Sequence, residues 1–307
     1  MEAGPPQRPR RGEGRSEAFF ILDRKRGSGY IQNIRSMNKL NRYGLAVEAL
    51  SELKSELLVV DDAVADSESP LETTLAELAP LPEDALFLGR ADDGLPVLLN
   101  LLDPAPGPLL IQGDAGSGKT GFLRSAAAAI EICHPARRVQ YGVVTPRPEE
   151  WEGLPPGPHQ IGIFSVRERT CLDFVLSLNA WAHSNRSDQS VVLFWDGLEL
   201  VDHLEAELVD NFRWLLLRGP VRKVWPIVTL DTSKKHGLDE WRGAFRTSIN
   251  GRVADRQNGL LEIEVSSRPH SFGAGRFILR EGNTQLGLWM PKSGIGVSAT
   301  PRLLLIG

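Results

Sequence analysis

The residue types between Gly113 and Thr120 are suited to holding a polyphosphate. The run is Gly113, Asp114, Ala115, Gly116, Ser117, Gly118, Lys119 and Thr120, which matches the phosphate-loop pattern G-x-x-x-x-G-K-[ST]. Glycines allow a tight turn whose backbone N–H groups point inward. We expect Lys119 to reach the β- and γ-phosphates of ATP and the Thr120 hydroxyl to bind Mg²⁺. The competing interpretation is a chance glycine-rich turn.

The segments on either side of this run favour the phosphate-loop interpretation. Residues 108–112 are mostly apolar and predict a buried strand, and residues 122–130 predict an alanine-rich helix. The N-terminus of a helix presents N–H groups and the positive end of its dipole to an anion. A strand, the loop and a helix in this order form the context in which the pattern binds phosphate.

Asp196 is the candidate for a second residue at a magnesium site. It follows the apolar run Val191–Trp195, which predicts a buried strand. A carboxylate at the end of such a strand is costly unless it finds a cation or hydrogen-bond donors. The alternative is a turn that begins at Asp196 before Gly197, since Asp and Gly are common turn residues. Because of the loop upstream, we favour Mg²⁺ held by Thr120 and Asp196.

Alternating apolar strands and helical stretches predict an α/β fold. A hairpin over residues 86–99, with an Asp-Gly pair at its turn, is expected before the loop. Later strands are expected at residues 138–144, 160–164, 191–195 and 224–230, followed by short apolar runs at residues 261–265, 276–279, 284–289 and 303–306. This alternation predicts a mainly parallel sheet with helices on both faces, and ligands bind such sheets at the carboxyl ends of the strands.

The N-terminal part of the chain differs from the rest in composition. Residues 1–17 are rich in Pro, Gly and Arg, and we expect no fixed structure there. Residues 18–70 are expected to form a helical extension and a linker, because apolar residues recur at helical spacing between residues 38 and 59. The P-loop domain is expected at residues 80–307. The basic charge before residue 43 suits nucleic-acid phosphates or anionic lipid, and a merely solvated tail is equally open.

Composition narrows the class of protein. The chain has 307 residues, a net charge of −4 and only two cysteines, Cys133 and Cys171. No apolar run approaches the roughly 18 residues of a membrane span, and no secretory signal peptide is evident at the N-terminus. Neither cysteine has a partner at zinc-ligand spacing. We therefore expect a cytoplasmic protein with one main core and no membrane span.

Together these features resemble the FtsK/HerA family of ring-forming P-loop motors, from about Leu86 to the C-terminus. The resemblance implies a RecA-like P-loop NTPase fold, ATP and Mg²⁺ as cofactors, a homo-oligomeric hexameric ring and DNA as the default polymer. It also implies two site residues. Asp231 occupies the place of the family's polar sensor, and Arg252 that of an arginine finger reaching a neighbouring subunit's γ-phosphate. An ordinary surface or ion-paired arginine is an equal interpretation of Arg252.

One departure from the family bears on hydrolysis. Gly197 follows Asp196, where motor members usually place a Glu that orients the attacking water, a contribution of roughly 10²–10⁴ in rate. Glu199 is the candidate to replace it, with a solvent-facing Glu199 as the alternative. A Gly here also resembles degenerate modules of type VII secretion ATPases. The function that we expect is an ATP-driven DNA translocase. The alternatives are a nucleotide-binding regulatory or scaffold subunit with slow or no hydrolysis, and a protein-secretion ATPase module.

The acidic run from Glu149 to Glu152 is interpreted as a solvated loop rather than a metal site.

Overall fold

The computed structural model describes residues 18–22, 30–33, 69–154, 156–234, 238–253, 275–281 and 284–294. Contacts between residues divide the chain into two units. One contains residues 1–19 and 31–66, and the other contains residues 20–30 and 67–307. The basic tail at residues 1–17 and the helix expected between residues 38 and 59 lie outside the described residues, as do the apolar runs at 261–265 and 303–306. The second unit carries the candidate site.

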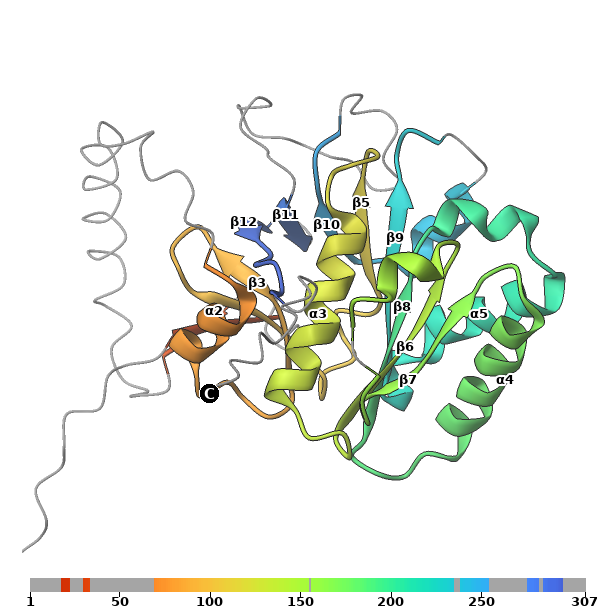
Figure 1. Cartoon of the computed structure of the whole chain (residues 1–307), viewed down its shortest axis with the longest axis horizontal. Helices are drawn as coiled ribbons and strands as arrows, with labels where there is room; N and C mark the ends of the chain where they lie inside the picture. The colour runs from red at the N-terminus through yellow and green to blue at the C-terminus, as the bar shows by residue number, and fades with distance from the viewer. Residues whose placement is uncertain are drawn as a thin grey trace, which may run out of the picture. The chain divides into compact units, whose positions relative to one another are not determined.

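Ten strands of the second unit lie in one sheet, in the order β4-β3-β12-β11-β10-β5-β9-β8-β6-β7 (Figure 1). The strands from β10 to β7 in this order run parallel, and β4, β3, β12 and β11 pair antiparallel. Their bounds are β3 (Ala85–Ala91), β4 (Pro96–Asn100), β5 (Leu109–Gly113), β6 (Val139–Thr145), β7 (Gln160–Ser165), β8 (Ser190–Trp195), β9 (Val224–Asp231), β10 (Thr247–Asn250), β11 (Arg276–Glu281) and β12 (Thr284–Trp289).

Two short strands precede this sheet in the chain, β1 (Ala18–Leu22) and β2 (Tyr30–Asn33). From Phe20 to Leu22, β1 pairs in parallel with β4.

Helices in the connections between parallel strands cover both faces of the sheet. They are α3 (Lys119–Cys133), α4 (Arg169–Ser184) and α5 (Ala206–Arg218). Successive side chains of a strand point to opposite faces, and Phe194 packs against Tyr141, whose hydroxyl donates to Glu131 of α3 (2.5 Å). The next residue, Trp195, stacks on Phe212 of α5 with ring centroids 3.8 Å apart. The expected α/β fold with helices on both faces is therefore confirmed.

The core lies where the parallel strands are sandwiched between these helices. Every residue of β8 and of β9 is buried, as expected for parallel strands covered on both sides. Such strands read as continuous apolar runs, which is why residues 191–195 and 224–230 were recognisable in the sequence.

The remaining elements are short. The expected hairpin is confirmed as β3 and β4, which turn at Gly94 with φ +86°. Helix α2 (Leu71–Leu78) was not expected; its Leu71 N–H donates to the Lys292 carbonyl (3.0 Å). The described residues also include four 3₁₀ helices: η2 (Pro148–Trp151), η3 (Leu198–His203), η4 (Pro220–Arg222) and η5 (Leu238–Ala244). Among the described residues no helix is both long and apolar enough to cross a lipid bilayer.

Replacing Phe212 with Ala should destabilise the domain strongly, because it removes a fully buried ring from the stack on Trp195. We expect the free energy of unfolding to fall by about 3 to 5 kcal/mol, measured by urea denaturation. Leu217→Ala on the same helix is the matched control, since Leu217 is 58% exposed and its loss should cost less than about 0.5 kcal/mol. Equal effects of the two changes would contradict this placement of the core.

Candidate phosphate-binding site

The predicted phosphate loop joins the end of β5 to the start of α3. Gly116 and Gly118 have φ angles of +75° and +96°, a region open to glycine at little cost. Gly118 is the N-cap of α3, no side chain caps this end, and its first turn holds no acidic residue. The first N–H groups of a helix lack acceptors within the helix. This end of α3 is therefore left open to an anion.

The outer side of the loop is anchored to the segments that follow β9 and β10. The Asp114 N–H donates to the Arg252 carbonyl (2.9 Å), and the Thr232 hydroxyl donates to Asp114 Oδ1 (2.5 Å). A Cβ atom on Gly113 would stand 2.7 Å from the Ser117 hydroxyl. Only glycine therefore fits at position 113 while Ser117 keeps its place, and the shape of the loop is fixed from outside.

Lys119 folds back over the loop. Its Nζ donates to the carbonyls of Gly113 (2.7 Å) and Asp114 (2.8 Å). Burial lowers the pKa of Lys119 below its ordinary value, although the nearby carboxylates, Asp231 first, oppose the shift. The ammonium thus lies between the loop and the acidic residues at the ends of β8 and β9.

Asp196 and Thr120, the two residues assigned to Mg²⁺ in the sequence analysis, are in direct contact. The Thr120 hydroxyl donates to Asp196 Oδ2 (3.0 Å), and Asp196 is only 6% exposed. Thr229 completes the arrangement, because its hydroxyl donates to Asp196 Oδ1 (2.6 Å) and accepts from the Gly197 N–H (2.8 Å). Thr229 was missed in the sequence; its one signal is a polar residue within the apolar run of β9.

Glu199 and Asp231 lie on the same side of the site. Gly197 has φ +102° and is the N-cap of η3, which turns Glu199 inward to 9% exposure. Glu199 Oε2 accepts the Asp231 N–H (3.2 Å), and Oε1 pairs with Lys234 Nζ (3.2 Å). Of the two interpretations of Glu199, the structure has the inward-facing one, with both carboxylate oxygens engaged.

Arg252 lies two residues beyond β10, on the outer side of the loop. One guanidinium nitrogen lies 3.8 Å from the point where a Cβ atom on Gly116 would stand. The side chain thus approaches the phosphate loop of its own chain. Its assignment as a finger for a neighbouring subunit stays a prediction.

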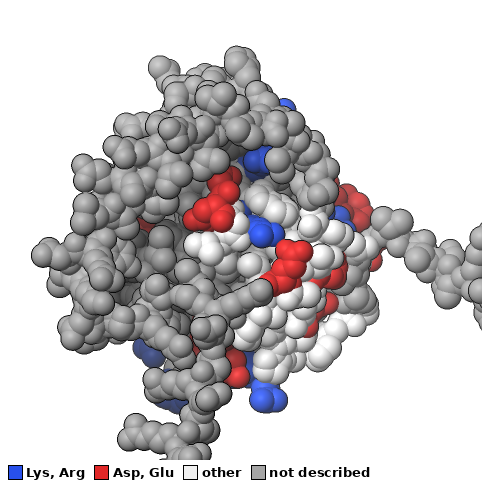
Figure 2. Space-filling model, turned by 90° about the vertical axis from the view of Figure 1, so that its left-hand side faces the viewer, with Lys and Arg blue, Asp and Glu red and all other residues white. Residues whose placement is uncertain are grey.

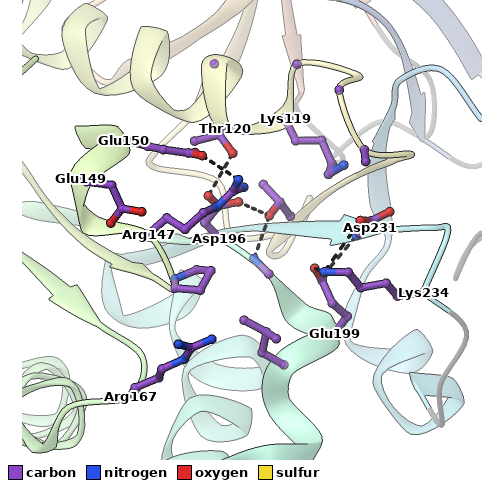
Figure 3. Close-up of a pocket in the computed structure, with 18 residues that line it drawn as sticks. Lys119, Thr120, Arg147, Glu149, Glu150, Arg167, Asp196, Glu199, Asp231 and Lys234 are labelled. Carbon is purple, nitrogen blue, oxygen red and sulfur yellow. Dashed lines mark hydrogen bonds and ion pairs between the residues drawn. The ribbon is translucent and has the colours of Figure 1, made fainter. Parts of the chain in front are cut away.

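A cavity of about 860 Å³ joins these residues (Figure 3). This volume lies within the range of small-molecule sites. Beside the loop, Asp196, Glu199 and Asp231, it is lined by charged residues that the sequence analysis did not assign to a site: Arg147, Glu149, Glu150, Arg167 and Lys234. The solvated-loop interpretation of residues 149–152 was incomplete, since Trp151 is fully buried and Glu149 and Glu150 line the cavity. The signal was available, because these residues follow β6, whose carboxyl end meets the same edge of the sheet.

The residues present fit a magnesium ion held together with phosphates. Mg²⁺ prefers oxygen ligands, keeps several waters and uses one or two carboxylates rather than an all-protein cage. The Thr120 hydroxyl and the Asp196 carboxylate supply such oxygens within hydrogen-bond distance of each other. The described part of the chain holds no group of three or more His, Cys, Asp or Glu residues placed to bind a metal ion.

The stability of this site should depend on pH through Asp231. Burial opposes its ionisation, but hydrogen bonds from Ser233 and the charges of Lys119 and Lys234 outweigh burial and lower the pKa of Asp231. A carboxyl with a lowered pKa stabilises the fold above its unfolded pKa of about 3.9 and loses this contribution as the pH falls through the folded value. Asp231→Asn should therefore be less stable than wild type at pH 7, and the gap should close below about pH 4.

Thermal unfolding across a pH series measures this gap. Asp202→Asn, an exposed change in η3, is the control and should leave the stability near that of wild type at every pH. A gap for Asp231→Asn that stays constant down to pH 3 would contradict the assignment.

Comparison with known proteins gives matches in structure but not in sequence. No protein-family model matches the chain, and no curated protein matches its sequence. The structure resembles ATPases 2 and 3 of EccC from Thermomonospora curvata, solved with a signal sequence peptide, at a TM-score of 0.55 and 16% identity over 71% of this chain and 42% of that one. It also resembles ATPases 2 and 3 of EssC from Geobacillus thermodenitrificans, at a TM-score of 0.53 and 13% identity over 71% and 49%.

A third match, the cytoplasmic domain of EssC, has a TM-score of 0.56 and 12% identity over 89% of this chain and 58% of that one. The chain thus spans less than two thirds of the length of these neighbours. At these identities the likeness concerns the fold, and it confirms the RecA-like architecture expected from the sequence. This chain has the fold of P-loop ATPases, and its structural neighbours are of the FtsK/HerA type.

Proposed function

We propose that this chain binds ATP together with Mg²⁺ in the cavity beside the phosphate loop. The observation that carries the proposal is the hydrogen bond between Thr120 and Asp196 (3.0 Å) next to the uncapped start of α3. This pair comes from the loop and from a strand that does not neighbour β5 in the sheet. A chance glycine-rich turn gives no reason for a buried carboxylate to meet the hydroxyl at the last position of the pattern.

The chain's own residues suffice to explain how the triphosphate would be held. Backbone N–H groups of the loop and of the start of α3 would donate hydrogen bonds to phosphate oxygens, and the dipole of α3 favours their negative charge. Lys119 exchanges the Gly113 and Asp114 carbonyls for the β- and γ-phosphates. Thr120 and Asp196 provide the oxygens for Mg²⁺, which when bound neutralises phosphate charge.

The geometry supports binding more directly than it supports rapid hydrolysis. Gly197 supplies no carboxylate after Asp196, and both oxygens of Glu199 are occupied by the Asp231 N–H and Lys234. A water at Glu199 would compete with these two partners for the carboxylate. We therefore propose tight ATP binding with slow turnover, the behaviour of a regulatory, scaffold or secretion-ATPase module.

A DNA-translocating motor is the second candidate, favoured by the FtsK/HerA-type fold. On this proposal the chain forms a hexameric ring in the cytoplasm, Arg252 reaches the neighbouring subunit's γ-phosphate, and Glu199 orients the attacking water. In the face shown in Figure 2, acidic and basic side chains of the described residues are interspersed. That part of the face offers no continuous basic path for a nucleic-acid backbone, so a protein polymer is equally compatible with it.

Lys119→Ala should abolish ATP binding, because it removes the cation that neutralises the β- and γ-phosphates. We expect at least a hundredfold loss of affinity by isothermal titration calorimetry, roughly the value of charge-assisted hydrogen bonds to two phosphates. Asp196→Asn should instead weaken the dependence of binding on Mg²⁺ while binding in EDTA stays near that of wild type. Wild-type affinity for ATP in Lys119→Ala would refute the proposed site.

The motor candidate is tested by turnover and assembly. If the chain is a motor, native mass spectrometry with ATP should show a hexamer. The rate of phosphate release should fall by about 10²-fold in Glu199→Gln and by about 10³-fold or more in Arg252→Ala. DNA should raise the rate and bind less tightly as salt increases. Tight ATP binding by a monomer without turnover would instead leave the regulatory or secretion module.

A further inference from the structure

The cavity wall opposite the phosphate loop carries two arginines that the proposed function leaves unused, Arg147 and Arg167. Arg147 is two residues beyond the end of β6 at Thr145. This end lies directly beside Asp196, whose N–H donates to the Val144 carbonyl (2.8 Å). Arg147 therefore stands at the carboxyl edge of the sheet next to the candidate magnesium site.

The backbone around Arg147 is well anchored, while its side chain is held only weakly. Its N–H donates to the Thr145 hydroxyl (3.2 Å), and its carbonyl accepts the Glu150 N–H (3.1 Å). Trp151, at the end of η2, is fully buried against Phe194. Prolines at 146 and 148 further restrict the chain on either side of it. The backbone of Arg147 is thus fixed in place, while its guanidinium can exchange one partner for another.

The present partner of Arg147 is Glu150, three residues later. Arg147 Nη1 lies 2.7 Å from Glu150 Oε1, with the two side chains 56% and 33% exposed (Figure 3). Exposed ion pairs of this kind contribute little to the stability of the fold. A guanidinium binds a phosphate through two parallel, charge-assisted hydrogen bonds, which are stronger and more specific. A phosphate in the cavity should therefore displace Glu150.

Position distinguishes Arg147 from Arg167. Arg167 lines this cavity and also a second one of about 480 Å³, which is formed by the N-terminal end of α4 together with η3 and α5. Arg147 lines the first cavity and is absent from the second. Figure 3 shows the Arg147 side chain reaching toward Asp196 and Thr120, whereas Arg167 comes from farther along the wall. Arg147 is thus the better placed to meet the outermost phosphate.

We propose that Arg147 binds the terminal phosphate of a nucleoside triphosphate held by its own subunit, exchanging Glu150 for the phosphate. Lys119 approaches the same phosphate from the loop side, so the Lys119 ammonium and the Arg147 guanidinium bind the phosphate from opposite walls of the cavity. A diphosphate lacks the group that Arg147 contacts, and the cavity therefore distinguishes the two nucleotide states. This inference rests on the proposed ATP site and adds a residue that distinguishes a bound triphosphate from a bound diphosphate.

The test compares the affinities for Mg²⁺-ADP and Mg²⁺-ATPγS, measured by calorimetry on the full chain. We expect Arg147→Ala to weaken ATPγS binding about tenfold or more and to leave ADP binding nearly unchanged. Arg147→Lys should restore part of the difference, since a lysine supplies charge without the paired geometry. Glu150→Gln should tighten ATPγS binding about twofold, because it removes the competing partner. Arg169→Ala is the matched control and should change neither affinity, because Arg169 is absent from the first cavity and pairs with Asp173 and Glu205, both exposed.

An unchanged ratio of the two affinities in Arg147→Ala, an equal loss for both nucleotides, or a selective loss in Arg167→Ala instead would overturn the proposal. If Arg147→Ala does not fold, the opposite shifts expected for Arg147→Lys and Glu150→Gln decide the matter. Wild-type protein that binds neither nucleotide, or that binds both without needing Lys119, would overturn the ATP site itself and this inference with it.

Discussion

A buried carboxylate needs donors, and the way Asp196 obtains them organises this domain. Its two oxygens accept hydroxyl groups from Thr120 at the start of α3 and from Thr229 in β9. These contacts connect the phosphate loop after β5 with β9 and with the end of β8. They can form only because β9 lies between β5 and β8 and pairs in parallel with both strands. The order of the sheet and the chemistry of the site are thus parts of one arrangement.

A second constraint comes from the loop, which must expose its N–H groups without help from the ligand. The structure meets it by binding the outer side of the loop to Thr232 and to the Arg252 carbonyl. The inner side is then left to Lys119 and the uncapped end of α3. This preorganisation lowers the ordering cost of taking up an anion. It also explains why residues after β9 and β10, far away in sequence, belong to the site although they form no recognisable motif.

Much of this arrangement could be predicted from the sequence, because local signals and global fold agree. The phosphate loop, Asp196 and the buried strands can each be recognised from residues that are close together in the sequence. The inward turn of Glu199 depends on the left-handed Gly197, and the roles of Thr229 and Arg147 depend on which strands lie beside β8. Such neighbour relations are not encoded in spacing along the chain. The pairing of α2 with Lys292 was missed for the same reason, since more than 200 residues separate the two segments.

We propose that the departure at Gly197 leaves a site better suited to holding a nucleotide than to cleaving it. A crystal structure with Mg²⁺ and ATPγS tests this account most directly. It should show the β-phosphate within hydrogen-bond distance of the amides of residues 116–120, Lys119 Nζ moved from the Gly113 and Asp114 carbonyls to the phosphates, and the metal ion beside Thr120. A nucleotide bound elsewhere, or a loop that keeps Lys119 on its carbonyls at saturating ATPγS, would contradict it.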